Sequence, residues 1–252
     1  MIQKLKNIVR NNKKLSNLSW AIRDLFGVTK QSIHENYFRK KTKHIIPNYL
    51  ATAKTKKLQI GGGPNVLDGW LNVNVYCGDI GKEIKQAYMD ATIRFPFDDG
   101  TFDYIFAEHM IEHITYLQAD FMISECARVM KKGGRIRLAT PGWDNFVNIV
   151  KDNSPERVKE YFERLIFYHY GSDIPLDPSY ALNYISFHYN HVFIHSKASL
   201  SHLLTKYGFT NIEFFKPQVS NDPNLKDIEI NYVNIGRENN ALETLVIEGV
   251  KS

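Results

Sequence analysis

The sequence predicts an α/β protein with a doubly wound, mostly parallel sheet, and three observations carry that prediction. Short apolar segments alternate with segments of helical periodicity from residue 57 onward. Three consecutive glycines, Gly61-Gly62-Gly63, follow the first apolar segment directly, where they allow a sharp turn and a close approach of the backbone to a ligand. The 252 residues are enough to bury one full hydrophobic core.

The predicted elements follow one another through the middle of the chain. The clearest helix is Leu117–Met130, and Lys131-Lys132-Gly133-Gly134 is expected to end it. Ligands of such sheets bind outside the carboxyl ends of the strands, so the residues directly after each strand are the first candidates for a site. The expected strands are Leu58–Ile60, Leu71–Val75, Ala87–Asp90, Asp103–Ala107 and Arg135–Thr140, the last closed by Pro141.

Several motifs in one order give this pattern a family resemblance. They are Leu58–Asn65, Gly69–Asn74, Phe95–Phe102, Glu112-His113 and Gly133-Gly134. In this order they resemble the class I S-adenosylmethionine-dependent methyltransferases, specifically a small type 11-like family whose cofactor loop reads like LNIGCGPN before a GWxNVD strand.

The end of the chain extends the resemblance. Leu203–Phe209 resembles the helix that precedes the last two strands of the family, and Thr210–Lys216 and Thr244–Gly249 would supply those strands. The resemblance therefore implies a Rossmann-like sheet of seven strands with S-adenosylmethionine as cofactor.

The same resemblance assigns cofactor-binding roles. Gly61 and Gly63 would flank the methionine part of the cofactor, Asn74 would hold the ribose hydroxyls, and Asp90 would accept a hydrogen bond from the adenine amino group. The full expected set is Gln59, Gly61, Gly62, Gly63, Asn74, Asp90, Ala91 and Glu108.

Two of these positions depart from the usual pattern. The family usually has Asp where this chain has Asn74, and many methyltransferases have an acid where it has Gln59. An amide lacks the charge that makes such hydrogen bonds roughly twice as strong. A cofactor-binding homologue without catalysis is therefore one alternative function.

The segment His109-Met110-Ile111-Glu112-His113 follows the strand Asp103–Ala107 and supplies candidate catalytic residues. If it is a helix, its two histidines and its glutamate share one face. Three interpretations are open: a histidine is the general base for an acceptor hydroxyl, the residues bind a divalent metal, or they brace the helix against the sheet. The candidate catalytic residues are His109, His113 and His191.

The metal interpretation rests on a second resemblance. Some small-RNA and quinone-precursor methyltransferases carry a Glu-x-x-Glu-His cluster at this place with a later histidine, and here His109 replaces the first Glu. The candidate ligands are Glu112, His113 and His191. A set rich in nitrogen suits zinc, iron or manganese better than magnesium.

Two segments are expected to flank or interrupt the methyltransferase domain, residues 57–252. Residues 142–196 are predicted as an α-helical, aromatic insertion that forms an acceptor lid, with His188-Tyr189-Asn190-His191 facing the site. Packing of its aromatic residues on Trp143 and Phe146 is the structural alternative, and both roles are compatible.

Residues 1–56 are predicted as a basic helical N-terminal arm, with 13 Lys and Arg against Asp24 and Glu35. Four roles are open for the arm: a packed helix with a solvated face, a cover for the cofactor, a peripheral contact with an anionic membrane, or a nucleic-acid clamp.

Several classes are disfavoured. An uninterrupted apolar run of about 18 residues is missing, so no transmembrane helix is expected. The two cysteines, Cys77 and Cys126, are too few for a disulfide framework and suit the cytoplasm. A DNA base methyltransferase would carry an Asn/Asp-Pro-Pro-Tyr/Phe loop where this chain has Ala107–Met110.

The sequence therefore predicts an S-adenosylmethionine-dependent O-methyltransferase that acts on a small or sugar-like acceptor. The link to sugars comes from a resemblance to enzymes encoded beside surface-glycan assembly genes. An RNA methyltransferase that uses the basic arm is the alternative enzyme.

Overall fold

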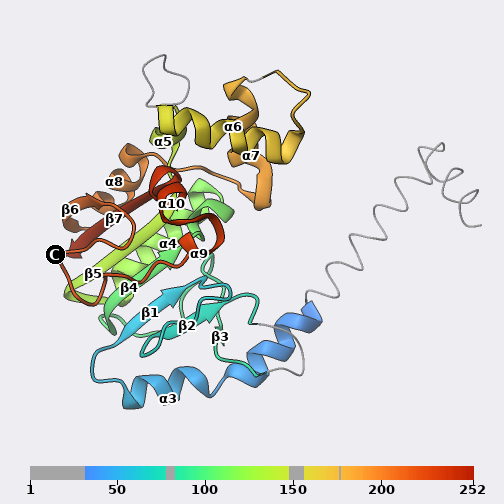
Figure 1. Cartoon of the computed structure of the whole chain (residues 1–252). Helices are drawn as coiled ribbons and strands as arrows, with labels where there is room; N and C mark the ends of the chain where they lie inside the picture. The colour runs from blue at the N-terminus through green and yellow to red at the C-terminus, as the bar shows by residue number, and fades with distance from the viewer. Residues whose placement is uncertain (1–31, 78–82, 148–155, 176) are drawn as a thin grey trace, which may run out of the picture.

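A single seven-stranded sheet forms the centre of the computed structural model, which describes residues 32–77, 83–147, 156–175 and 177–252 (Figure 1). The strand order is β3-β2-β1-β4-β5-β7-β6. The first five strands are parallel, and β7 is antiparallel to both β5 and β6. The predicted Rossmann-like, mostly parallel sheet is therefore confirmed. The strands are β1 Lys57–Ile60, β2 Leu71–Asn74, β3 Ala87–Tyr88, β4 Phe102–Glu108, β5 Met130–Pro141, β6 Phe209–Phe215 and β7 Thr244–Lys251.

The strand order reverses beside β1, and this reversal positions the site. Leu58 of β1 pairs with Leu71 of β2 on one side and with Ile105 of β4 on the other. In a doubly wound sheet the crevice at such a reversal lies outside the carboxyl ends of the two central strands. Gly61 and His109 directly follow β1 and β4, so both residues lie at the mouth of that crevice.

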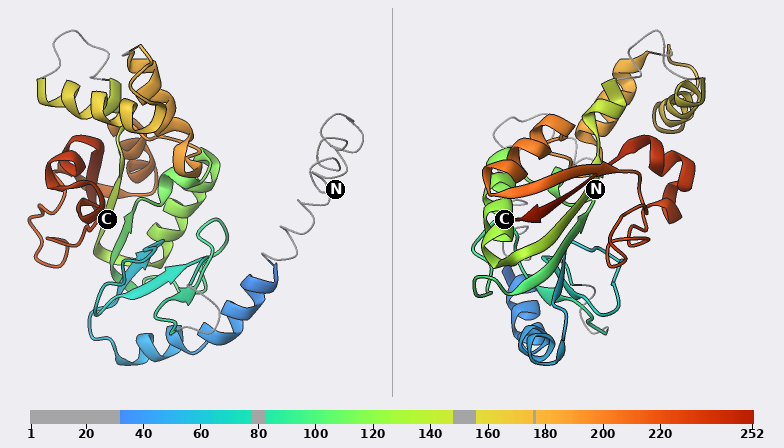
Figure 2. Two further views of the ribbon diagram at one scale, coloured as in Figure 1. Left: turned by 45° about the vertical axis from the view of Figure 1, so that its right-hand side comes forward. Right: turned by 90° about the vertical axis from the view of Figure 1, so that its left-hand side faces the viewer.

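Helices cover one face of the sheet, and a long connection covers the other (Figure 2). Helices α4 (Tyr116–Val129) and α8 (Lys197–Lys206) each begin with a capping box, in which Thr115 and Ser196 are the caps. They pack against the apolar side chains of the strands in the main core. On the opposite face, Leu225 from the connection between β6 and β7 packs in a separate cluster with Phe106 and Val246.

The segment Phe95–Phe102, one of the family-like motifs, is held by α4. Phe97 and Phe102 are buried with ring centroids 4.8 Å apart. The guanidinium of Arg128 donates to the carbonyls of Phe95 and Phe97 and to the carboxylate of Glu125. This motif therefore builds the core beside the crevice and does not line it.

The boundary between α4 and β5 differs from the expectation. The helix ends at Val129 and β5 begins at Met130, so Lys131–Gly134 does not form a separate turn. Met130 pairs with Phe102, whereas Arg135 pairs with Tyr104, which leaves the lysines and glycines as a bulge in the new strand. Gly133, at φ 78°, supplies the left-handed residue that the bulge requires.

The described residues of 142–196 form a largely helical body beyond the carboxyl ends of the strands (Figure 1). Its helices are α5 Trp143–Val147, α6 Glu156–Tyr170 and α7 Pro178–Phe187, followed by the 3-10 turn η3 His188–Asn190. A small core of its own holds the body together, with Phe146 and Phe162 at a centroid distance of 5.3 Å. The short helices α9 (Tyr232–Ile235) and α10 (Arg237–Glu243) precede β7, and Leu242 packs on the same core.

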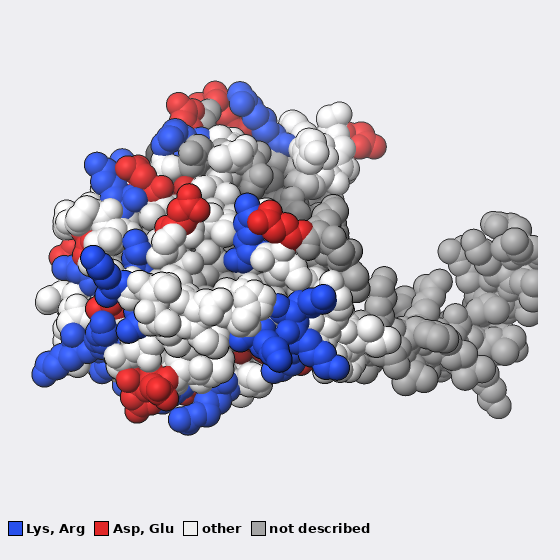
Figure 3. Space-filling view, turned by 90° about the horizontal axis from the view of Figure 1, so that it is seen from below, with Lys and Arg blue, Asp and Glu red and all other residues white. Residues whose placement is uncertain are grey.

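The described part of the basic arm packs on the domain. Residues 32–42 are helical and bury Phe38 completely, and α3 (Ile45–Thr52) contributes Ile45, Tyr49 and Leu50 to the main core. Seen from below, several Lys and Arg side chains lie close together, and Asp and Glu side chains lie at several places on the same face (Figure 3). Residues 1–31 of the predicted arm lie outside the described residues. Among the described helices, none combines the length and the apolar character needed to cross a membrane.

Candidate active site

Two cavities meet at the carboxyl ends of β1 and β4. The smaller has a volume of about 300 Å³ and begins at the glycine turn after β1. The larger, about 810 Å³, lies between the domain and the helical insertion. His109 and His113 line both cavities, so a group in one cavity can meet a group in the other beside these two imidazoles.

The smaller cavity contains half of the predicted cofactor-binding set. Gly61 has a φ of 70°, and a Cβ at this position would lie 2.4 Å from Cγ of Met110, so the site requires glycine. Asn74 ends β2, and its Oδ1 accepts from the Tyr76 amide at 3.2 Å. The predicted residues that line the cavity are Gly61, Asn74, Asp90 and Ala91.

The other four predicted residues, Gln59, Gly62, Gly63 and Glu108, do not line the smaller cavity. Side chains alternate along a strand, so Ile60 faces the cavity and Gln59 does not. The carboxylate of Glu108 instead accepts from the amides of Ile230 and Asn231 at 3.0–3.1 Å and anchors that connection. Burial raises the pKa of Glu108 despite these hydrogen bonds.

Gly62 packs closely against its neighbours in the turn and leaves no room for a side chain. A Cβ at Gly62 would lie 2.6 Å from the carbonyl oxygen of Asn65 and 2.7 Å from Nε2 of Gln59. The cavity wall also contains Thr92 and Met110, which the sequence did not single out. The amide and hydroxyl of Thr92 donate to Asp90 at 2.8 and 2.7 Å, and this fixes the orientation of the Asp90 carboxylate.

The prediction that His109, Glu112 and His113 share one face of a helix is wrong, because the segment is not a continuous helix. Only Ile111–His113 form a single 3-10 turn, and His109 precedes it with a left-handed φ of 47°. Nδ1 of His109 nevertheless lies 3.1 Å from Oε1 of Glu112. His113 turns away, and its ring packs on that of His191 at a centroid distance of 5.1 Å.

Glu112 orients His109. Its side chain is fully buried, and its second oxygen accepts from the Thr140 hydroxyl at 2.9 Å. Nε2 of His109 is buried and has no hydrogen-bond partner among the residues that the structure describes. A buried polar atom of this kind, in a side chain that lines two cavities, is typical of a position where a ligand is bound.

The two groups also shift each other's pKa. Burial by itself lowers the pKa of His109, but the hydrogen bond and charge of Glu112 outweigh burial, and the pKa is raised. Burial alone would raise the pKa of Glu112, but the bond to His109 reverses the shift, and the pKa is lowered. The Glu112 carboxylate therefore stabilises the imidazolium form of His109.

Glu112, His113 and His191 lie close enough to share a metal ion, since one ligand atom from each falls within 4.8 Å of the others. His191 follows η3, and its Nδ1 lies 2.6 Å from the Ile185 carbonyl, which can only accept. Nδ1 therefore carries the proton and Nε2 keeps its lone pair when the ring is neutral. Burial lowers the pKa of His191 and favours that neutral form.

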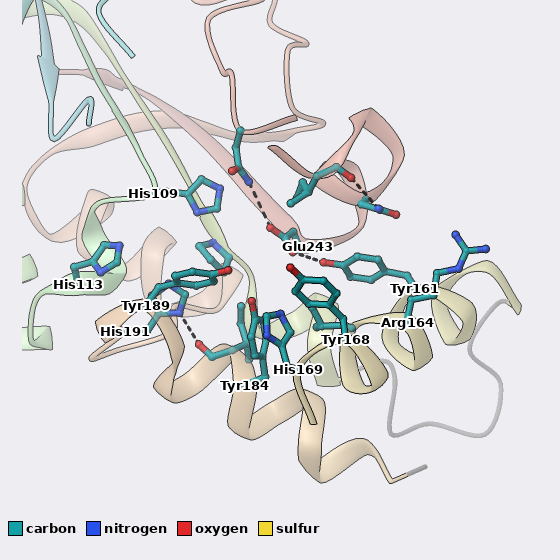
Figure 4. A pocket seen from close by; sticks show the side chains of 16 residues that line it. His109, His113, Tyr161, Arg164, Tyr168, His169, Tyr184, Tyr189, His191 and Glu243 are labelled. Carbon is teal, nitrogen blue, oxygen red and sulfur yellow. Dashed lines mark hydrogen bonds between the residues drawn. The ribbon is translucent and has the colours of Figure 1, made fainter. Parts of the chain in front are cut away.

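The larger cavity is aromatic with a polar centre (Figure 4). Most of its aromatic residues belong to the predicted lid. The sequence did not predict the contribution from the end of the chain, because Asn231, Asn239 and Glu243 carry no motif. Its lining residues are His109, His113, Pro141, Tyr161, Arg164, Leu165, Tyr168, His169, Tyr184, Ile185, Tyr189, His191, Asn231, Ile235, Asn239 and Glu243.

Residues 58–138, about a third of the chain, match the family described as a methyltransferase domain. The chain has no significant match among curated proteins.

Solved structures of several methyltransferases are similar to this chain. A SAM-dependent methyltransferase from Archaeoglobus fulgidus is 15% identical, with 86% of this chain and 94% of that chain covered and a TM-score of 0.44. Geranyl diphosphate C-methyltransferase from Streptomyces coelicolor A3(2) is 13% identical, with 83% and 76% covered and a TM-score of 0.44. Phosphoethanolamine N-methyltransferase 2 from Haemonchus contortus is 16% identical, with 84% and 52% covered and a TM-score of 0.41.

The match to a methyltransferase domain over the glycine turn and the first five strands, on a mostly parallel sheet of seven strands, supports an S-adenosylmethionine-dependent methyltransferase. The resemblance found in the motifs is thereby confirmed. The left-handed glycine, whose missing Cβ keeps the turn open, fits the cofactor. When bound, the cofactor supplies an electrophilic methyl group on a sulfonium.

Proposed function

We propose that this enzyme transfers the methyl group to a hydroxyl of a small or sugar-like acceptor held in the larger cavity. The carrying observation is that His109 lines both cavities and has a buried Nε2 without a partner in the described chain. Transfer from a sulfonium needs alignment of the acceptor and, for a hydroxyl, removal of one proton. Cavities that adjoin at His109 support both requirements.

His109 is the proposed general base. Its Nδ1 bonds to Glu112, so Nε2 is the atom that would take the acceptor proton. The hydroxyl oxygen forms the new bond to the methyl carbon as the carbon–sulfur bond breaks, and the proton passes to Nε2. The Glu112 carboxylate stabilises the imidazolium that results.

The test uses His109→Asn, because asparagine tolerates the left-handed backbone of this position better than alanine. His202→Asn, an exposed position on α8, is the matched control. Transfer of tritium from labelled S-adenosylmethionine is measured with methyl glycosides and catechol as acceptors. Binding of S-adenosylhomocysteine is measured by calorimetry.

We expect His109→Asn to lower the transfer rate by about 100-fold or more, while S-adenosylhomocysteine affinity stays near that of the wild type. The control should keep both properties. Wild-type transfer rates in His109→Asn, or no transfer to any of these hydroxyls by the wild-type enzyme, would contradict the proposal.

A divalent metal at Glu112, His113 and His191 is the second arrangement that the geometry supports. A bound ion would lower the pKa of an acceptor hydroxyl and so reduce the demand on a base. It ranks second because both Glu112 oxygens already have hydrogen-bond partners, His109 and Thr140.

Calorimetry with ZnCl₂ and MnCl₂ on metal-free protein tests this arrangement. This arrangement predicts binding near the micromolar range, roughly −8 kcal/mol, and its loss in His191→Ala but not in His202→Ala. Binding that is unchanged in His191→Ala, or no binding with and without S-adenosylhomocysteine, would exclude this metal site.

A further inference from the structure

We propose that the larger cavity is a carbohydrate subsite in which the carboxylate of Glu243 accepts hydrogen bonds from acceptor hydroxyls and Tyr189 supplies the ring on which the sugar stacks. This inference rests on the proposed function, because it names the acceptor class and the residues that select it. Neither Glu243 nor Tyr189 is the proposed base, and neither lines the cofactor cavity.

Glu243 lies at the end of α10, where three distant parts of the chain converge. The Tyr161 hydroxyl donates to its Oε2, and the side-chain amide of Asn231 lies 3.4 Å from its Oε1. Figure 4 shows the carboxylate between His109 and Tyr161, on the wall of the cavity. A carboxylate offers about four acceptor positions, so two remain for an acceptor. Two neighbouring hydroxyls of a sugar ring match that pair.

The charges around the cavity favour a neutral acceptor over a cation. Among the described residues that line the cavity, Glu243 is the only carboxylate, and Arg164 and four histidines line the same space. Burial outweighs the bond from Tyr161 and raises the pKa of Glu243. A polyhydroxylated ring uses the carboxylate as an acceptor and carries no charge to be balanced.

Tyr189 is the best placed of the cavity's aromatic residues for stacking. It has a left-handed φ of 55° and the next residue, Asn190, has 62°, so the turn holds two strained residues in succession. Tyr189 is 64% exposed, meets Tyr184 and His188 edge to face, and lies tilted to His191 at a centroid distance of 6.2 Å. Tyr184, in contrast, already stacks on His169 at a centroid distance of 4.0 Å.

The experiment measures binding and therefore does not need methyl transfer. Saturation-transfer NMR is recorded with S-adenosylhomocysteine present and with methyl α-glucopyranoside, methyl α-mannopyranoside and methyl α-rhamnopyranoside as probes. Tyramine is the cationic probe. The variants are Glu243→Gln, with Glu160→Gln on α6 as control, and Tyr189→Asn, with Phe187→Asn as control. Phe187 is 75% exposed and does not line the cavity.

We expect at least one glycoside to receive saturation at its ring protons. Glu243→Gln should weaken its binding about tenfold, and Tyr189→Asn about fivefold, while both controls bind as the wild type does. Calorimetry with S-adenosylhomocysteine identifies variants that have kept their fold. If one of the two variants loses that binding as well, the other variant decides the result.

The inference is overturned if no glycoside binds, if tyramine binds in place of the glycosides, or if neither variant differs from its control. The proposed function fails separately. Glycoside binding without transfer would overturn O-methylation and leave the subsite, whereas transfer to catechol without glycoside binding would overturn the subsite alone.

Discussion

Replacing Gly61 with alanine tests the cofactor cavity, because the cost of the change is local and has two separable parts. The first is backbone strain: at a φ of 70°, any L-residue costs roughly 1–2 kcal/mol. The second is steric, since the new Cβ would lie 2.4 Å from Cγ and 2.9 Å from Cβ of Met110. Met110 lines the same cavity, so relief of the clash must change the cavity wall.

Gly133→Ala isolates the first part. Gly133 has a φ of 78° and nothing within 4 Å of an added Cβ, and it lies at the opposite end of the sheet. Both variants should lose roughly 1–2 kcal/mol of unfolding free energy from strain, with a further loss in Gly61→Ala. Only Gly61→Ala should lose cofactor affinity, by about tenfold or more, which corresponds to about 1.4 kcal/mol.

Calorimetric titration with S-adenosylhomocysteine and urea unfolding followed by circular dichroism measure the two quantities. Wild-type affinity in Gly61→Ala would mean that the cavity at the turn does not hold the cofactor. Equal loss of affinity in both variants would mean that strain, and not the cavity, controls binding.

Three further predictions follow from buried charges. The pKa of His109 is raised, and the base is neutral only above that pKa, so the rate of methyl transfer should fall as pH decreases. Glu112→Gln should shift this fall in rate to lower pH. An unchanged pH–rate profile in Glu112→Gln would contradict the role of Glu112 beside His109. His195 is fully buried with its pKa lowered to about 4, so the folded state binds fewer protons than the unfolded state between about pH 4 and 6.5. The unfolding free energy should drop by about 2 kcal/mol from pH 7 to 5, and much less in His195→Gln, by urea titration at both pH values. Arg137 is buried between Glu229 and Glu248, so Arg137→Met should cost about 3–5 kcal/mol in the same assay, against under about 1 kcal/mol for the half-exposed Arg135→Met.

Local patterns carried the prediction of the sheet. Strands β1, β2, β4 and β5 appear as short apolar segments, and the turn at Gly61 appears as a glycine cluster, because both depend on neighbours in sequence. The ends of elements were less well predicted. Whether Lys131–Gly134 forms a turn or a bulge depends on pairing with Phe102 and Tyr104, which lie about 30 residues away.

The site divides in the same way. Its histidines stood out in the sequence, and the proximity of Glu112 to His109 follows from their spacing along the chain. The pairing of His113 with His191, and the convergence of Tyr161, Asn231 and Glu243, arise only when the insertion and the last helices pack above the sheet.

The sequence by itself thus determined the fold class and the cofactor turn, because periodicity and the conformational freedom of glycine act over a few residues. Only the tertiary structure decided which residues form the acceptor cavity. Glu243 has no local signal, since its role depends on a tyrosine and an asparagine that the folded chain brings to it. A carboxylate acquires a defined function from burial and partners, and long-range packing supplies both.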